Sequence, residues 1–488
     1  MFRGLAALIT LLVAALAAAG ASALRASPAP ADPNDAPLAT RRSTPHPATA
    51  ETGRDAAPDS GSRVLPDAPA PAVQDPTPPS RADTALRVYL LTMGPGDAVW
   101  ERFGHNAIRI VDPVRGEDVT YNYGMFDFAA EDFFPRFLRG DMLYWMAGFP
   151  SRAVVDAYAR SNRAVYAQEL NLTAEQKRRL REFLEWNARP ENRYYAYDYY
   201  RDNCATRVRD AIDRALGGQL EAVLGDVATA TTYRSHTRRL TADDLPIYTG
   251  LNLAMGAAID RPLTAWEESF LPMRLREHLR TVRVRGPDGM PVPLVRSETV
   301  LVAADRAAVP EQAPDRRTGY LLAGAVLGAI FLGLGRLTAR GRRIGRLGLV
   351  AAGGAWAVGT GVVGTVIALL WAMTNHTVTY GNENLLQINP LPLALVVLLP
   401  LAVLRGRAVR AARWLAWAAA TASAAGLLLQ ALPGFDQVNG EIIALALPAH
   451  FGLAGGLWVA SRRHPVDRGA RVSERVRGTP LSPSAPRA

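Results

Sequence analysis

The stretch Tyr197-Asp198-Tyr199-Tyr200-Arg201-Asp202-Asn203-Cys204-Ala205-Thr206-Arg207 holds the only cysteine of a chain of 488 residues. Asp202 or Asn203 can cap a helix, and apolar residues follow at helical spacing until the glycines at 217–218. This pattern predicts a helix over residues 203–216 with Cys204 in its first turn. Unpaired amides and the positive end of the helix dipole favour a thiolate there. A buried structural cysteine is the alternative that these residues leave open.

Residues 1–24 have the composition of a secretory signal peptide or an N-terminal anchor. Arg3 precedes an apolar run over residues 5–19, and Ala-Ser-Ala at 21–23 is typical of a cleavage site. The chain that follows is therefore expected outside the cytoplasm, where a thiol without a disulfide partner is exposed to oxidation. A cysteine kept under these conditions indicates a chemical use. Residues 25–83, rich in Ala, Pro, Asp and Ser, are predicted to form a disordered linker.

The second half of the chain has the composition of a membrane domain. It contains five apolar runs, each close to the roughly 20 residues that span a bilayer, at 319–335, 347–373, 388–404, 414–432 and 442–460. The loops between them alternate between Arg-rich and free of Arg and Lys. By the positive-inside rule, the Arg-rich loops and the basic tail at 462–488 are cytoplasmic, and everything before residue 319 is outside. We therefore predict a five-helix transmembrane domain over 319–461 in a bacterial inner membrane, with the preceding domain on the periplasmic face.

The net charge of +10 comes largely from arginines in these loops and in the tail. No basic stripe alternates with aromatic residues, so nucleic-acid binding is not expected. Cys204, His105 and His236 lack the paired spacing of zinc ligands, so no metal site is expected either.

Residues 84–310 are predicted to form one soluble α+β domain with a small antiparallel sheet. The expected strands lie at 86–91, 103–111 and 119–123, with two short ones around 281–302, and the expected helices at 151–161, 173–187 and 203–216. His105 falls on the second strand, directly after Gly104. A strand histidine facing a cysteine at a helix N-terminus is the papain-type arrangement, in which imidazole takes the thiol proton. A strand histidine with ordinary hydrogen-bond partners is the alternative.

Several motifs in the same order resemble the Lnb-type lipoprotein N-acyltransferase family. In the soluble domain they are Gly94-Pro95-Gly96-Asp97, Trp100-Glu101-Arg102-Phe103-Gly104-His105-Asn106, Tyr121-Asn122-Tyr123-Gly124-Met125-Phe126-Asp127-Phe128 and Asn203-Cys204-Ala205-Thr206-Arg207. In the membrane part the loop His376-Thr377-Val378-Thr379-Tyr380-Gly381-Asn382-Glu383-Asn384-Leu385-Leu386 is similar as well. The order of His before Cys also resembles the permuted papain-like (NlpC-like) fold of lecithin:retinol acyltransferase.

The resemblance implies a thiol acyltransferase that needs no cofactor. Cys204 would attack an ester carbonyl of a membrane phospholipid with His105 as general base, and the acyl chain would pass from the thioester to an amine, the N-terminus of a lipoprotein. Asn122 on the partner strand is the residue expected to orient the imidazole. The expected substrate-binding residues are Arg207, Asn203, His376, Asn382 and Asn384.

Two further points bear on this function. The aromatic stretch over residues 126–149 can line an acyl groove, dip into the membrane or simply form core. A membrane-anchored papain-like peptidase or amidase acting on cell-envelope peptide is the alternative function, because it would use the same thioester. Five membrane spans favour the acyltransferase, since a hydrolase of soluble peptide needs only one anchor.

Overall fold

The computed structural model describes residues 80–127, 132–286 and 288–462. The predicted signal, nearly all of the linker at 25–83 and the tail beyond 462 lie outside these residues. By their contacts the described residues divide into two compact units. The first unit contains residues 80–137, 141–231 and 262–309, and the second contains 138–140, 232–261 and 310–462.

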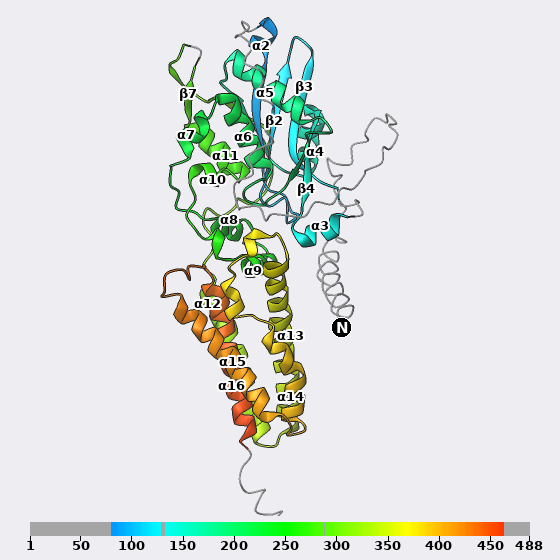
Figure 1. Cartoon of the computed structure of the whole chain (residues 1–488), viewed down its shortest axis with the longest axis vertical. Helices are drawn as coiled ribbons and strands as arrows, with labels where there is room; N and C mark the ends of the chain where they lie inside the picture. The colour runs from blue at the N-terminus through cyan, green and yellow to red at the C-terminus, as the bar shows by residue number, and fades with distance from the viewer. Residues whose placement is uncertain (1–79, 128–131, 287, 463–488) are drawn as a thin grey trace, which may run out of the picture. The chain divides into compact units, whose positions relative to one another are not determined.

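The first unit is built on an antiparallel sheet of seven strands (Figure 1). In sheet order these are β6 (Tyr194–Ala196), β4 (Leu143–Pro150), β3 (Glu117–Met125), β2 (His105–Asp112), β1 (Arg87–Met93), β5 (Val165–Leu170) and β9 (Val295–Val302). Strands β7 (Arg283–Arg285) and β8 (Pro291–Pro293) form a separate pair. The three predicted N-terminal strands are β1, β2 and β3, and the antiparallel α+β class is confirmed.

Strands β4, β5 and β6 were not predicted, for a physical reason in each sequence. Strand β4 mixes aromatic residues with Gly148, so its sequence does not alternate cleanly between apolar and polar. Strand β5 buries Gln168 and Glu169, although polar side chains of this kind are usually exposed. Strand β6 has only three residues. Their strand conformation comes from pairing with neighbours rather than from local pattern.

Helices lie on both faces of this sheet. They are α2 (Arg81–Ala85), α3 (Phe133–Arg139), α4 (Ser151–Arg160), α5 (Ala174–Asn187), α6 (Cys204–Leu216), α7 (Gln219–Leu224), α10 (Ala265–Glu268) and α11 (Pro272–Thr281). The predicted helices α4, α5 and α6 are confirmed to within a residue, because each begins at a recognisable boundary. Helix α5, for example, begins at a capping box in which the Thr173 hydroxyl accepts the Gln176 amide at 3.2 Å.

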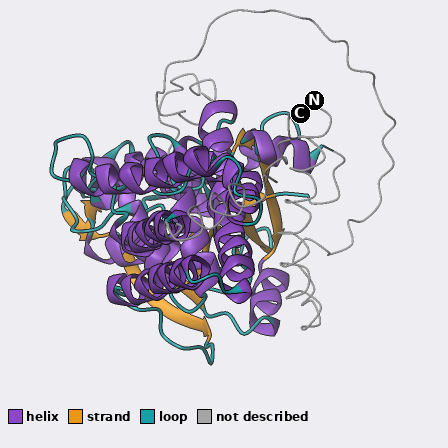
Figure 2. Ribbon diagram, turned by 90° about the horizontal axis from the view of Figure 1, so that it is seen from below, coloured by secondary structure: helices purple, strands orange, loops and turns teal. Residues whose placement is uncertain are grey.

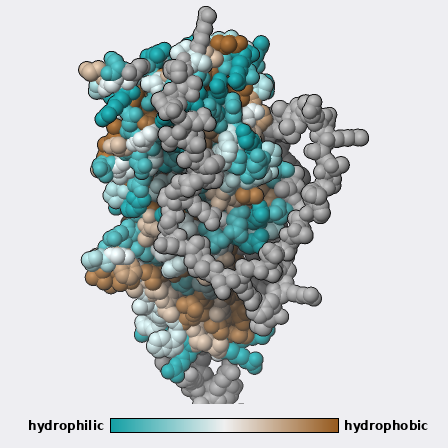
Figure 3. Space-filling view, turned by 45° about the horizontal axis from the view of Figure 1, so that its top comes forward, coloured by the Kyte–Doolittle hydropathy of each residue, from teal (hydrophilic) through white to brown (hydrophobic). Residues whose placement is uncertain are grey.

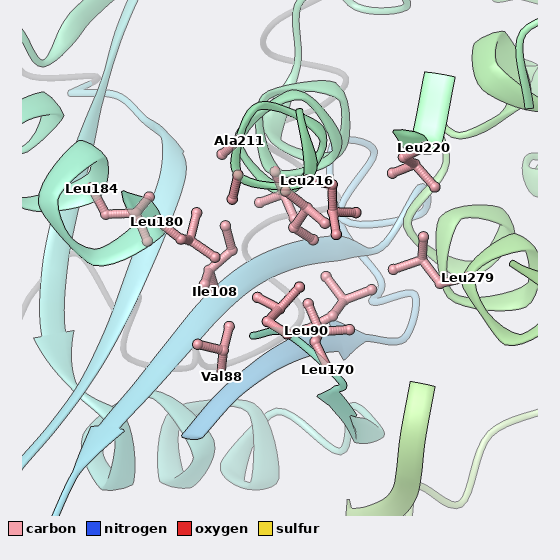
Figure 4. Close-up of a cluster of buried hydrophobic side chains, with 14 of the residues drawn as sticks. Val88, Leu90, Ile108, Leu170, Leu180, Leu184, Ala211, Leu216, Leu220 and Leu279 are labelled. Carbon is pink, nitrogen blue, oxygen red and sulfur yellow. The ribbon is translucent and has the colours of Figure 1, made fainter. Parts of the chain in front are cut away.

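Two hydrophobic clusters hold these layers together. On one face of the sheet, Val88, Leu90 and Ile108 pack against α5, α6 and α11 (Figure 4). On the other face, Leu91 and Ala107 pack against α4, in a cluster with Val154 and Tyr158. Each fully buried aliphatic side chain contributes about 1.5–3 kcal/mol. The sheet is therefore fixed from both sides, and its strand ends are held in place.

The second unit contains the membrane helices, which run side by side (Figure 2). Its helices are α8 (Tyr233–Leu240), α9 (Leu245–Ala254), α12 (Arg317–Ala339), α13 (Arg343–Met373), α14 (Leu395–Val403), α15 (Val409–Leu429) and α16 (Gly440–Ser461), with 3-10 turns η2 (Ala257–Ile259), η3 (Thr377–Thr379), η4 (Glu383–Leu386) and η5 (Leu391–Ala394). Glycines bring α12 and α16 into backbone contact, since a Cβ at Gly328 would lie 2.6 Å from the Pro448 carbonyl oxygen. Apolar side chains cover the surface of these helices (Figure 3).

Five membrane spans were predicted, and their number stays a prediction. Among the described residues, four segments are long and apolar enough to cross a membrane: Arg317–Ala339, Arg343–Met373, Glu383–Val403 and Gly440–Ser461. The run at 414–432 does form a helix, α15. Its first turns carry Arg410 and Arg413 and its centre is largely alanine, so it is less apolar than the other four.

The residues of the predicted soluble domain at 84–310 are divided between the two compact units. Residues 232–261, with α8 and α9, group with the membrane helices. Arg234 on α8 is 1% exposed, pairs with Asp260 at 2.7 Å, and donates to the backbone carbonyls of Asn252, Met255 and Gly256. This Arg-rich segment therefore forms a buried polar core in the second unit, which sequence polarity does not indicate.

Candidate active site

Cys204 is the first residue of α6, and Asn203 is the cap that starts this helix. The Asn203 side-chain oxygen accepts the amides of Ala205 at 2.9 Å and Thr206 at 3.0 Å. Its side-chain nitrogen donates to the carbonyls of Tyr199 and Phe270. The amide group of Asn203 therefore fixes where α6 begins, and its predicted substrate-binding role stays a prediction.

The Cys204 side chain lies against the end of β3. Its Cβ is 3.4 Å from the position that a Cβ would take at Gly124, whose φ of +87° favours glycine. The sulfur accepts hydrogen bonds from the backbone N–H groups of Asn106 and Ala205. Because Asn106 follows His105 on β2, these contacts put the sulfur at the end of the sheet where β2 begins. Cys204 keeps part of its surface exposed.

His105 occupies the same end of the sheet and contacts Asn122. Strands β2 and β3 pair Ala107 with Asn122, and the same register continued by two residues places Gly124 opposite His105. The His105 Nε2 atom lies 3.2 Å from Asn122 Oδ1. The structure thus joins His105 to Asn122 and places the Cys204 sulfur beside the amide of Asn106, the next residue along β2.

The amide of Asn122 selects one tautomer of the imidazole. Asn122 Nδ2 donates to the Thr120 carbonyl at 3.3 Å, which turns Oδ1 toward His105. An amide oxygen only accepts, so His105 Nε2 carries the proton and Nδ1 is the basic nitrogen. This tautomer is the one in which the imidazole can act as a base through Nδ1.

Burial determines the charges of Cys204 and His105. It raises the pKa of the Cys204 thiol to about 11, although the nearby amides and the charge of Arg163 act in the opposite direction. It lowers the pKa of His105 to about 4, and Arg163 lowers it further while Asn122 raises it. The resting site at neutral pH therefore holds a thiol and a neutral imidazole. Desolvation thus opposes the thiolate that the helix dipole alone favours.

Arg163, which sequence reasoning missed, lies behind the imidazole. It is 5% exposed, donates to the Gly94 carbonyl at 2.9 Å and to Glu101 at 3.1 Å, and lies over the Tyr158 ring, which stacks on His105. Two of its partners belong to the conspicuous motifs at 94–97 and 100–106. Those motifs therefore hold a buried cation beside the candidate site, and the clustered glycines with Glu101 were the available signal.

Tyr195 is a second residue that sequence reasoning missed. Its hydroxyl oxygen lies 3.9 Å from the position of a Cβ at Gly124, and it has no hydrogen-bond partner among the described residues. Burial raises the pKa of Tyr195 well above its usual value, and the charge of a Cys204 thiolate raises it further. The phenol is therefore neutral and carries its proton beside the sulfur. Among the described residues, no three His, Cys, Asp or Glu side chains are grouped as metal ligands.

Two parts of the chain match known protein families. Residues 81–239 match the Lnb N-terminal periplasmic domain, and residues 349–447 match the Lnb transmembrane domain. The chain belongs to the Lnb family. Lnb proteins are enzymes of the membrane, and this one is a multi-pass membrane protein with a periplasmic domain. No curated protein and no solved structure matches the chain, so the papain-like resemblance stays a prediction.

Within the Lnb periplasmic match, Arg207 is buried beside Asp202. Its side chain is 4% exposed, forms a bidentate ion pair with Asp202, and lies 4.3 Å over the Tyr195 ring. These contacts give Arg207 a structural role at the start of α6, and its predicted headgroup contact stays a prediction.

The Lnb transmembrane match contains the loop that was expected to bind substrate. The Asn382 side chain donates to the carbonyls of Leu253 and Ala254, and the Asn384 side chain donates to those of Asn252 and Leu253. Both asparagines are buried and tie the loop to the end of α9, and their substrate-binding role stays a prediction. His376 is half-buried, and its carbonyl accepts the Thr379 hydroxyl at 2.8 Å.

Proposed function

We propose that this Lnb protein is a thiol acyltransferase of the bacterial inner membrane. It would take an acyl chain from phospholipid onto Cys204 and pass it to an amine, the N-terminus of a lipoprotein. The observation that carries this proposal is the sulfur at the first residue of α6, which lies against the strand ends that carry His105 and Asn122. Membership of the Lnb family and the membrane helices support a lipid donor.

In the first step, the Cys204 sulfur attacks the ester carbonyl carbon of the phospholipid. The thiol proton passes to His105 Nδ1, and then to the departing alkoxide as the carbon–oxygen bond breaks. The products are a Cys204 thioester and a lysophospholipid. The Cys204 backbone N–H, at the N-terminus of α6, is placed to stabilise the oxyanion of the tetrahedral intermediate.

The two pKa values bear on the timing of this proton transfer. Burial raises the pKa of the thiol and lowers the pKa of the imidazole, so both directions disfavour moving the proton before attack. A preformed ion pair is therefore scarce. The transfer is instead coupled to attack on the carbonyl, when the charge moves from sulfur to the oxyanion.

In the second step, the amine of the acceptor attacks the thioester carbonyl. The amine loses a proton to the neutral imidazole, the carbon–sulfur bond breaks, and the proton returns to the Cys204 sulfur. The product is an amide, and the enzyme regains its resting form. If water replaced the amine, the same site would act as a hydrolase, which is the alternative function.

Mass spectrometry of the purified protein with defined phospholipid vesicles tests this proposal. We expect an added acyl mass on Cys204, which is absent in Cys204→Ala and in His105→Ala. The matched control is His278→Ala, because His278 pairs with Glu268 at 2.8 Å outside the site. Adding an amine-bearing lipopeptide should move the acyl chain to that amine. Full acyl transfer by Cys204→Ala would refute the mechanism, and release of free fatty acid alone would favour the hydrolase.

A further inference from the structure

Helix α3 of the first unit exposes aromatic side chains. Its sequence is Phe-Phe-Pro-Arg-Phe-Leu-Arg, and none of its residues is buried. Phe134 is 60% exposed and Phe137 is 39% exposed. Exposed aromatic side chains on a helix that also carries arginines are typical of segments that lie in the membrane interface.

The sheet places α3 near Cys204. Helix α3 is followed by β4, whose first residues pair with the end of β3: Trp145 lies opposite Met125. That end of β3 contains Gly124, which contacts Cys204. Helix α3 therefore lies near the end of the sheet that carries the candidate active site. It is drawn beside the end of β4 (Figure 1).

A row of aromatic rings leads from α3 toward the sulfur. Phe133 lies 6.2 Å from Phe126, Phe126 lies 5.1 Å from Tyr144, and Tyr144 stacks on Tyr197 at 4.2 Å, measured between ring centroids. Tyr197 is close enough to Cys204 for a thiolate there to raise its pKa, after the larger effect of burial. All four rings are only partly buried. This row offers apolar contacts from the exposed helix to the candidate nucleophile.

The end of α3 is hydrogen-bonded to the loop that follows the membrane helix α13. The Arg139 carbonyl accepts the amide of Asn375 at 2.7 Å. A Cβ at Gly140 would come within 2.8 Å of the backbone of Asn375 and His376, so the two backbones touch there. Asn375 is two residues beyond Met373, where the span α13 ends. The last residue of α3 thus touches the backbone just beyond the end of α13.

The chain itself limits how far Phe134 can be from Arg139. Phe134 precedes Arg139 by five residues, which is about 7.5 Å along a helix at 1.5 Å per residue. Arg136 and Arg139 lie on the same helix, and their cationic side chains suit the phosphates of lipid headgroups. The occupant that best matches apolar rings, basic residues and this position is the lipid surface.

We propose that α3 is a lipid-binding element, with Phe134 and Phe137 inserted into the outer leaflet. The aromatic row from Phe133 to Tyr197 then guides an acyl chain of that leaflet toward Cys204. Insertion of α3 is independent of the chemistry of the thiol. Only the guidance of the acyl chain rests on the function proposed above.

Quenching of a fluorophore at α3 tests the insertion. In the Cys204→Ala chain, Phe134→Cys is labelled with a fluorescent maleimide and reconstituted in phosphatidylglycerol and phosphatidylethanolamine vesicles that contain bromine-labelled acyl chains. We expect loss of emission relative to unlabelled vesicles. The matched control is Val114→Cys, which is 61% exposed in the turn between β2 and β3, at the opposite end of β2 from His105. The control should be quenched by aqueous iodide but not by the brominated lipid.

The outcomes separate the possible occupants of α3. Quenching at position 134 by iodide alone would mean that α3 faces water, and protection from both quenchers would mean that a protein covers it. Either result overturns the proposal. Phe137→Cys repeats the measurement if the first variant does not accumulate.

The same experiment is independent of the proposed function. It uses a chain without the thiol, so quenching by lipid without any acyl-enzyme in the wild type would leave the lipid-binding element standing while the transferase fails. An acyl-enzyme in the wild type without quenching by lipid would leave the transferase standing while the lipid-binding element fails.

Discussion

The pH dependence of Cys204 alkylation reports directly on the charges of the candidate site. Burial raises the pKa of the thiol from an ordinary value of 9.0 to about 11. At pH 7 the thiolate fraction is then about a hundredfold lower than for an ordinary cysteine, because each pKa unit is a factor of ten in this range, or 1.36 kcal/mol. Iodoacetamide reacts with the thiolate, so its rate at Cys204 should be lower by about the same factor.

The perturbation is His105→Ala, compared with the wild type across pH 5 to 11. Since the pKa of His105 is lowered to about 4, the imidazole is neutral over this whole range and lends no charge to the sulfur. The variant should therefore not raise the apparent pKa of alkylation. The reference cysteine is Val114→Cys in the Cys204→Ala chain, because Val114 is exposed in the turn between β2 and β3. We compare apparent pKa values, because absolute rates also depend on access to the sulfur.

A particular result would refute this reasoning. If the wild-type rate reached a plateau below pH 7, and His105→Ala moved the inflection to higher pH, the site would hold a thiolate–imidazolium pair at rest. Desolvation would then have been outweighed by the mutual attraction of the two groups. The proton would in that case be transferred before attack on the ester, and not during it.

Three further predictions concern the orienting residue, the second unit and the topology. Asn122→Ala should slow single-turnover acylation about three- to tenfold without changing circular dichroism, because one hydrogen bond worth about 0.5–1.5 kcal/mol fixes the tautomer; an unchanged rate would exclude this role. Arg234→Ala should leave Asp260 buried without its partner, cost about 3–5 kcal/mol and lower the melting temperature in detergent, which a surface arginine would not do. In a cysteine-free chain, Thr377→Cys should react with an impermeant maleimide added to intact cells and Arg340→Cys should not; the opposite pattern would invert the topology.

The sequence predicted the elements whose signals are local. Helix α6 begins at Asn203 because its side chain caps the helix, and it ends at Gly217, which adopts φ +69°. Strands β1 to β3 are recognisable from the alternation of apolar and polar residues, and the membrane segments from their long apolar runs. The third span was harder to delimit, because Pro390 and Pro392 interrupt it and it passes through 3-10 turns before α14 begins.

The sequence singled out the residues of the candidate site, and the structure adds their contacts and their burial. Cys204, His105 and Asn122 were each recognisable from a cysteine at a helix start, a histidine on a strand and a polar residue on the partner strand. Their contacts follow from the β2–β3 register, which alternation of side chains fixes. Arg163 was missed, because it comes from a segment before β5 whose approach to the imidazole depends on the pairing of β1 with β5.

By itself, the sequence determined where α6 starts, which runs are apolar enough for a membrane, and which loops carry arginine, because capping, hydropathy and charge are properties of neighbouring residues. Only the tertiary structure decided that the Cys204 sulfur is desolvated, that Arg163 reaches Gly94 and Glu101, and that residues 232–261 pack with the membrane helices. These outcomes depend on atoms that are distant in the chain. The cost of removing a charge from water is set by what surrounds the group in space, so the charge of a cysteine at a helix terminus depends on the fold around it.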